Sequence, residues 1–204
     1  MRSLLICLNV CLLIWPTISC AQNKAEPIGA VSQSQETVDA PFGAEKLRLG
    51  IFAHNFGVVA SRVEHGVDAN AELSFKPIDA LWGAEPTHGL MLNGIGNTSY
   101  LYTGFSWEWD VFEDGQRSGL FVIPFFGLAI HDGKREPEPK RRGLGCQLLF
   151  REAIEIGWRF NKDTLDSSQV WAISVLTDHL SHGGLCEDRN QGPDNTGIRF
   201  HWYY

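Results

Sequence analysis

A histidine and a serine two residues apart, His179 and Ser181, form the pair in this sequence best suited to nucleophilic chemistry. A serine hydroxyl becomes a nucleophile when a histidine base removes its proton. The pair ends an apolar run that contains Trp171, Ile173 and Val175 at the same two-residue spacing, and residues two apart on a strand point to the same face. Nucleophile and base therefore share an apolar face, which suits a hydrolytic site only if the substrate is itself a lipid.

Short alternating segments bounded by Gly, Pro, Asn or Asp recur from Glu45 to the end, a pattern typical of strands joined by turns. Helical spacing of apolar residues is scarce. We expect eight strands, near residues 46–58, 66–76, 87–96, 99–110, 119–131, 143–160, 168–180 and 195–204.

Each clear strand has one apolar face and one polar or ionic face. A soluble barrel turns its apolar face inward, whereas an outer-membrane barrel turns it toward lipid and keeps a polar interior, so alternation alone cannot distinguish them. Aromatic clusters at strand ends, an export signal and an aromatic C-terminus favour the membrane form. We therefore predict an all-β, eight-stranded antiparallel up-and-down transmembrane β-barrel. The residues expected outside are Val67, Leu73, Phe75, Ile154, Ile156, Ile198 and Phe200, and those expected inside are Glu72, Arg151 and Glu155.

The N-terminus has the pattern of a secretory signal peptide: Arg2, an apolar stretch from Leu4 to Trp15, and small residues before Gln22. We expect residues 1–21 to be removed, and Cys20 leaves a lipid-modified N-terminus open as an alternative. Residues 22–44 are polar and without periodicity, so we expect a flexible lead-in to a barrel domain at 45–204.

The formal charge of −7 argues against a nucleic-acid partner. No cofactor is expected. The histidines have no mutual spacing that argues for a metal, and the charged stretch from Asp132 to Arg142 is expected to be a solvated loop, with phosphate binding left open. The histidines concerned are His54, His65, His88, His131, His182 and His201.

Two cysteines of the expected exported chain, Cys146 and Cys186, fall at the same end of neighbouring strands. In an oxidising compartment such a pair can form a disulfide. Two unpaired thiols, with Cys146 packing as a small apolar residue, are the alternative.

The up-and-down topology places His179 and Ser181 in the membrane. With the N-terminus in the periplasm, the connection after the seventh strand faces outward. The pair then lies on the barrel exterior at the level of the outer leaflet, where lipopolysaccharide is found, and the outer membrane of a Gram-negative bacterium is the expected location.

Several segments resemble one enzyme family. The segment from His179 to Ser181 with the Gly-Gly step after it, Asp188-Arg-Asn190, and Asn195-Thr-Gly197 before an aromatic last strand are similar to the PagL-type lipid A 3-O-deacylases, barrels of the acyloxyacyl-hydrolase-like kind. Residues 47–54, 66–72 and 144–160 also look like strands of that family. The resemblance covers residue 45 to the end.

The resemblance implies hydrolysis of a 3-O-linked fatty-acyl ester of lipid A, with His179 as the base and Ser181 as the nucleophile. The family's asparagine at the oxyanion site matches Asn195. Backbone N–H groups of Gly183 and Gly184 are expected to contribute further donors.

The acid of the family's triad falls at Arg199, which cannot accept a hydrogen bond from an imidazole. We expect Glu187 or Asp188, in the loop before the last strand, to replace it. A non-catalytic barrel of the same fold, with a structural or lipid-binding role, stands as the alternative function.

Overall fold

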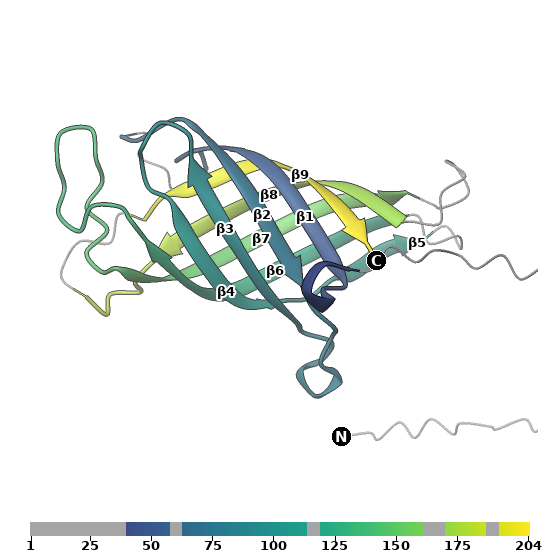
Figure 1. Ribbon diagram of the computed structural model, residues 1–204. Helices are drawn as coiled ribbons and strands as arrows, with labels where there is room; N and C mark the ends of the chain where they lie inside the picture. Colours follow the sequence, from purple (N-terminus) through teal and green to yellow (C-terminus); the bar gives the residue numbers. More distant parts are fainter. Residues whose placement is uncertain (1–39, 58–62, 114–118, 161–169, 187–191) are drawn as a thin grey trace, which may run out of the picture. The chain divides into compact units, whose positions relative to one another are not determined.

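The computed structural model describes residues 40–57, 63–113, 119–160, 170–186 and 192–204. Within them one antiparallel sheet runs in the order β4-β3-β2-β1-β9-β8-β7-β6-β5, and a further pairing of β4 with β6 closes it into a barrel (Figure 1). The strands are β1 (Lys46–Ala53), β2 (Val67–Ser74), β3 (Glu85–Asn93), β4 (Tyr100–Ser106), β5 (Trp109–Glu113), β6 (Gly119–His131), β7 (Leu148–Phe160), β8 (Val170–Ser181) and β9 (Asp194–Tyr203). The helical segments among the described residues are two 3₁₀ turns, η1 (Pro41–Gly43) and η2 (Asp79–Leu81). None of the helices in the described ranges has the length and apolar character needed to cross a membrane.

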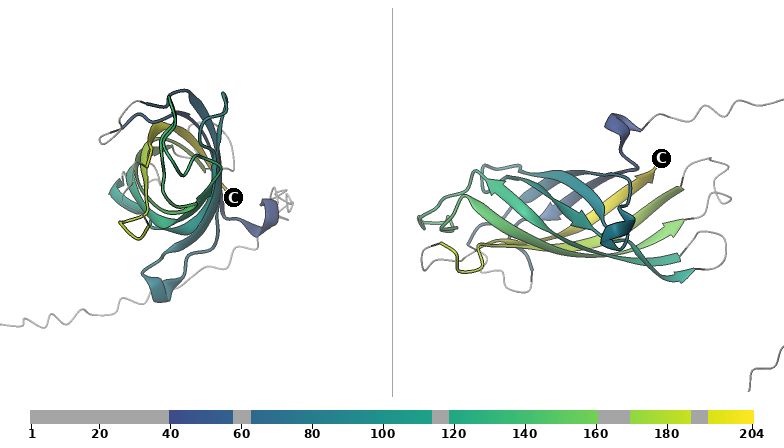
Figure 2. Two further views of the ribbon diagram at one scale, coloured as in Figure 1. Left: turned by 90° about the vertical axis from the view of Figure 1, so that its left-hand side faces the viewer. Right: turned by 90° about the horizontal axis from the view of Figure 1, so that it is seen from below.

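β4 and β5 together occupy one place in the barrel wall. β4 pairs with residues 125–131 of β6, and β5 pairs with residues 119–122 of the same strand. Only Trp107 and Glu108 separate them. The barrel is therefore eight-stranded and closed, which confirms the predicted fold, and Figure 2 shows the closed wall in end view.

The two faces of the wall carry the predicted chemistry. Val67 and Ile198 are 60% and 62% exposed on the outside, whereas Glu72, Arg151 and Glu155 are buried. All seven residues predicted outside are at least partly exposed. An apolar exterior around an ionic interior is the arrangement of a membrane barrel.

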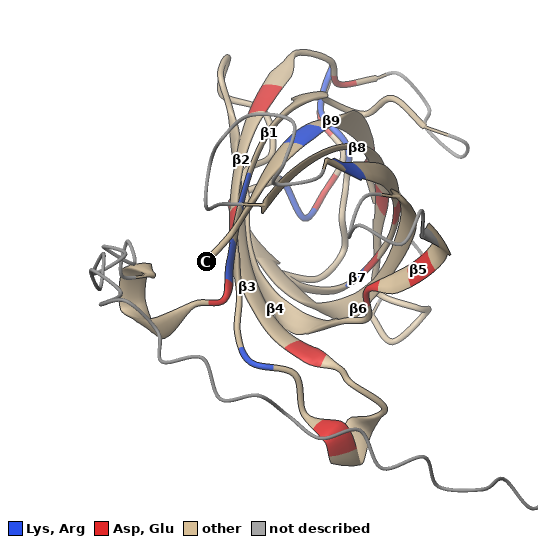
Figure 3. Ribbon diagram, turned by 90° about the vertical axis from the view of Figure 1, so that its right-hand side faces the viewer, with Lys and Arg blue, Asp and Glu red and all other residues tan. Residues whose placement is uncertain are grey.

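The interior contains paired charges beside buried apolar and aromatic side chains such as Met91 and Phe125. Arg199 bonds Glu72 at 2.7 Å and Glu155 at 2.9 Å, and Arg48 bonds Glu72 at 2.7 Å. Figure 3 marks the charged positions in a view into the barrel from the end where the C-terminus lies. The packing is close: a Cβ on Gly89 would lie 2.3 Å from the Tyr102 ring.

The two ends of the barrel differ in what they carry. The start of β1 pairs with the end of β9, so both barrel termini lie at one end. The opposite end carries the connections between β1 and β2, β3 and β4, β6 and β7, and β8 and β9. β7 begins at Leu148 instead of near residue 143, because the backbone N–H groups of Leu144 and Gly145 donate back to Lys134 and Arg135 within the loop.

Candidate active site

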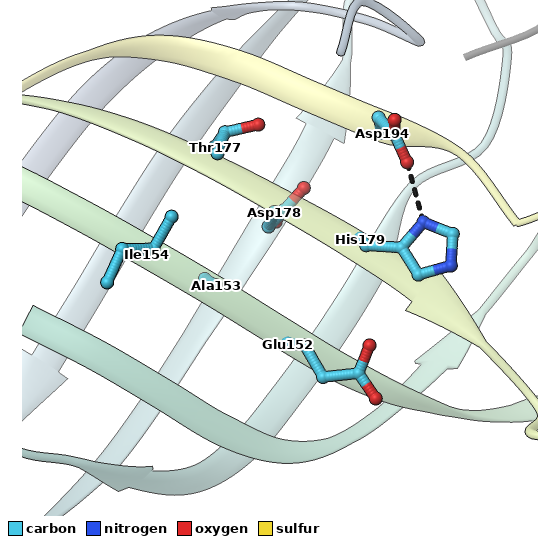
Figure 4. A pocket seen from close by; sticks show the side chains of 7 residues that line it. All are labelled: Glu152, Ala153, Ile154, Thr177, Asp178, His179 and Asp194. Atoms are coloured by element: carbon cyan, nitrogen blue, oxygen red, sulfur yellow. Dashed lines mark hydrogen bonds and ion pairs between the residues drawn. The ribbon is translucent and has the colours of Figure 1, made fainter. Parts of the chain in front are cut away.

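His179 lies on the outer face near the end of β8, and its partner is Asp194. The two residues are directly opposite each other in the β8–β9 register. His179 Nδ1 lies 2.6 Å from Asp194 Oδ1, and the Asp194 side chain is 4% exposed (Figure 4). Because a carboxylate accepts this hydrogen bond, Nδ1 is the donating nitrogen, and Nε2 is the ring nitrogen available to another partner.

Ser181 is the last residue of β8 and lies on the same face as His179. It pairs with Phe150 of β7 and is 8% exposed. No hydrogen bond joins His179 to Ser181 in the described part of the chain. Both side chains start from one strand face, and in hydrolases the hydrogen bond between base and nucleophile is often long before substrate binds.

Asp194, the carboxylate that contacts His179, was not predicted from the sequence. Glu187 and Asp188 lie outside the described residues. The expected last strand began at residue 195, one position too late to include Asp194. Strand alternation could have identified it, because Asp194 is an even-numbered residue of the same strand as the outward residues Ile198 and Phe200.

Asn195 does not lie with this group. Its side chain is fully buried on the inner face, where its amide nitrogen donates to Asp178 Oδ1 and to the Tyr100 hydroxyl, each at 3.0 Å. Its oxygen accepts the backbone N–H of Asn55. We therefore correct the expectation that Asn195 stabilises an oxyanion, because a side chain committed inside the barrel does not reach the outer face.

Gly183 and Gly184 follow Ser181 after one intervening residue, His182. Both are exposed and have positive φ angles of 59° and 79°, conformations that glycine adopts without strain. The N–H of Gly184 donates to His182 Nδ1 at 3.2 Å. The N–H of Gly184 is therefore already engaged within this turn.

A second carboxylate, Glu152 of β7, lies on the other side of His179. It is exposed on the outer face and directly opposite His179 in the β7–β8 register. Figure 4 shows Glu152, His179 and Asp194 as one row across three neighbouring strands. Glu152 was not among the residues predicted from the sequence, although its even number in β7 assigns it to the face of Ile154 and Ile156.

Two hollows in the outer wall extend from this row. The first hollow, of about 290 Å³, contains the row of Glu152, His179 and Asp194. The second hollow, of about 450 Å³, shares Ile154 and Thr177 with the first, so the two adjoin on the wall. The first hollow is lined by Glu152, Ala153, Ile154, Thr177, Asp178, His179 and Asp194. The second hollow is lined by Phe56, Gly57, Ile154, Ile156, Val175, Thr177 and Thr196.

A disulfide tethers the loop that follows Ser181. Cys186 in this loop is bonded to Cys146, just before β7, with their Cα atoms 5.9 Å apart. The bond links the loop after β8 to the connection that leads into β7, and so restricts the region around Ser181 and Gly183.

A polar cluster holds the neighbouring loops at the same end. His54 bonds Asp68 at 2.8 Å and Glu64 at 3.1 Å, and Arg141 bonds Glu64 at 2.9 Å. Burial alone lowers the pKa of His54, but the hydrogen bonds to the two carboxylates raise it to about 9. Burial raises the pKa of Glu64, and the bonds from His54, Arg142 and Arg141 outweigh it and lower that pKa to about 2. Within the described residues, no three His, Cys, Asp or Glu side chains are grouped as a metal site requires.

Comparison with known proteins relates this arrangement to one family. The model of the lipid A 3-O-deacylase (PagL) family matches residues 65–203, which include every residue of the outer row. No curated protein matches the chain. The crystal structure of the outer membrane enzyme PagL is similar with a TM-score of 0.57 and 16% sequence identity, over 76% of this chain and 97% of that one. With the family model covering more than half of its length, the chain belongs to the lipid A 3-O-deacylase (PagL) family.

Proposed function

We propose that this barrel is an outer-membrane deacylase that hydrolyses a 3-O-linked fatty-acyl ester of lipid A, with Ser181 as nucleophile, His179 as base and Asp194 as the orienting acid. The observation that carries the proposal is the hydrogen bond between His179 and Asp194 on a lipid-facing wall. A buried carboxylate that orients an imidazole there is costly in a purely structural surface and is what a serine hydrolase needs.

The location of the row matches the location of lipid A. The row lies at the end opposite the barrel termini. In outer-membrane barrels the termini face the periplasm and the opposite end faces outward. A signal peptide at residues 1–21 accounts for export, and the row then meets the outer leaflet, where lipopolysaccharide is the lipid.

The proposed chemistry starts from the hydrogen bond between His179 and Asp194. His179 Nε2 takes the proton of the Ser181 hydroxyl as Oγ attacks the ester carbonyl carbon, and Asp194 stabilises the imidazolium that forms. The imidazolium then protonates the sugar oxygen as the ester bond breaks, leaving an acyl group on Ser181. Water, deprotonated by His179, releases the fatty acid and restores the serine. No cofactor takes part in these steps.

Two features support the intermediates of this reaction. The backbone N–H of Gly183, with that of Gly184 in a lesser role, is proposed as a donor to the developing oxyanion. The two adjoining hollows beside His179 offer an apolar surface, including Ile154, Ile156 and Val175, against which the acyl chain lies.

The proposal is tested by expressing the protein in a Gram-negative host and analysing its lipid A by mass spectrometry. Wild type should give lipid A that has lost one ester-linked hydroxy fatty acid, and Ser181→Ala should leave lipid A intact. Thr103→Ala is the matched control, because Thr103 is a hydroxyl residue exposed on the outer face of β4, away from the row.

A non-catalytic lipid-binding barrel is the second candidate. The observation in its favour is that His179 and Ser181 share no hydrogen bond in the described part of the chain, while Ser181 is largely covered. Unchanged lipid A in hosts that express folded wild type would support this candidate over the enzyme.

A further inference from the structure

Directly behind the outer row, the barrel interior contains a cluster centred on Asp178. Its Oδ2 accepts the Tyr100 hydroxyl at 2.7 Å and Arg151 Nε at 2.8 Å, and its Oδ1 accepts the Asn195 amide at 3.0 Å. The Asn195 amide also donates to the Tyr100 oxygen. These four side chains, the inner cluster, are all buried and come from β4, β7, β8 and β9.

Every residue of the outer row is the chain neighbour of an inner-cluster residue. Glu152 follows Arg151, His179 follows Asp178, and Asp194 precedes Asn195. Adjacent residues of a strand point to opposite faces, so a side chain fixed inside fixes the direction of its neighbour outside. The Asp178–Asn195 pair is also the next step of the β8–β9 register after the His179–Asp194 pair.

The outer row needs such support because it lies at strand ends. β9 starts at Asp194, and β8 stops two residues after His179. One slip of register at this point would turn Asp194 away from His179. The side-chain hydrogen bonds of the inner cluster oppose that slip at the first inward position of β9.

We propose that Asn195 is a positioning residue for the reaction: through Asp178 and Tyr100 it holds β9 in the register that presents Asp194 to His179. This inference rests on the proposed function for its activity readout. It differs from an oxyanion role, since a positioning residue acts only through Asp194, whereas an oxyanion donor acts on the substrate itself.

A double-mutant cycle separates the two roles. Asn195→Ala should lower kcat by about ten- to a hundredfold, with a smaller effect on KM, since small displacements of a catalytic group cost up to about that much. In an Asp194→Asn background the same change should cost little, because Asp194 no longer orients His179. An equal loss in both backgrounds would overturn the proposal, because an oxyanion donor remains effective when the triad is impaired.

Asn70→Ala is the matched control. Asn70 is buried on the inner face of β2 and donates to a tyrosine, Tyr102, and to the backbone oxygen of Leu90, but has no neighbour in the outer row. If loss of any buried asparagine lowers activity by destabilising the barrel, Asn70→Ala should match Asn195→Ala. We expect it to retain wild-type kcat.

A readout independent of activity distinguishes failure of this inference from failure of the proposed function. The Nδ1–H proton of His179, hydrogen-bonded to a carboxylate, should give a downfield proton NMR signal in detergent micelles, assigned by its absence in His179→Gln. The signal should persist in Asn70→Ala and disappear or broaden in Asn195→Ala. An unchanged signal in Asn195→Ala would contradict the inference whether or not the wild type is active. If Asn195→Ala does not fold, Asn195→Ser, which keeps one donor for Asp178, should show a partial loss, and no loss would again contradict it.

Discussion

Asp194 faces His179 across β8 and β9 at 2.6 Å, on the outside of the barrel. If this contact orients the base, Asp194→Asn should lower kcat by about 10³- to 10⁴-fold, as loss of the orienting acid does in serine hydrolases. Steady-state hydrolysis of lipid A measures the effect. The double variant Glu187→Gln with Asp188→Asn is the control, and it should retain activity. Loss of activity in that control, with Asp194→Asn still active, would show that Glu187 or Asp188 orients His179 instead.

The bond between Cys146 and Cys186 should be present in protein recovered from membranes and should stabilise the fold. Thiol labelling without reductant should modify neither cysteine, and labelling after reduction should modify both. Cys146→Ser with Cys186→Ser should lower the free energy of unfolding by about 2–4 kcal/mol. Urea unfolding in lipid vesicles measures this change, with reductant added to wild type as the parallel condition. Full labelling of both thiols without reductant would show that the bond does not form.

The His54 cluster should make stability depend on pH in the alkaline range. The pKa of His54 is raised to about 9 in the folded protein, against about 6.5 for an unperturbed histidine. Its contribution to stability is therefore complete below about pH 6.5 and is lost as the pH rises through 9. Wild type should lose stability between these values more steeply than His54→Gln, as measured by urea midpoints across the range. Parallel profiles for the two proteins would show that His54 is not the group responsible.

Removing one partner of the interior charge network should be strongly destabilising. Arg199→Ala leaves Glu72 and Glu155 without their shared cation, and such a loss costs about 3–5 kcal/mol. Ile198→Ala, its lipid-facing neighbour, is the control and should have a much smaller effect on the urea-induced unfolding of the barrel. Equal effects of the two substitutions would mean that the interior pairs contribute little net stability.

The barrel could be predicted from the sequence because alternation and face chemistry are local signals. Glu72 and Val67 alternate along one strand and so lie on opposite faces, and the aromatic clusters with the export signal indicate that the face of Val67 meets lipid. The strand ends were harder to predict, because hydrogen bonds from loop residues such as Leu144 and Gly145 decide where β7 starts.

The site was predicted only in part, because some of its contacts join residues of different strands. The shared face of His179 and Ser181 follows from their spacing, but the acid depends on the register of two strands, which no single segment encodes. Asn195 illustrates the limit of resemblance: its parity, shared with Arg199 and His201, indicates the interior, and the resemblance assigned it to the exterior site. In the structure Asn195 is buried inside the barrel, as its position in the alternation indicates.

The most direct test of the account is the release of fatty acid from purified lipid A by the purified, refolded barrel. Wild type should release one ester-linked fatty acid per lipid A and leave the amide-linked chains in place, and Ser181→Ala should release none above the rate without protein. Equal release by both proteins would contradict the assignment of Ser181 as nucleophile. No release by folded wild type would contradict the assignment of lipid A deacylation to this barrel.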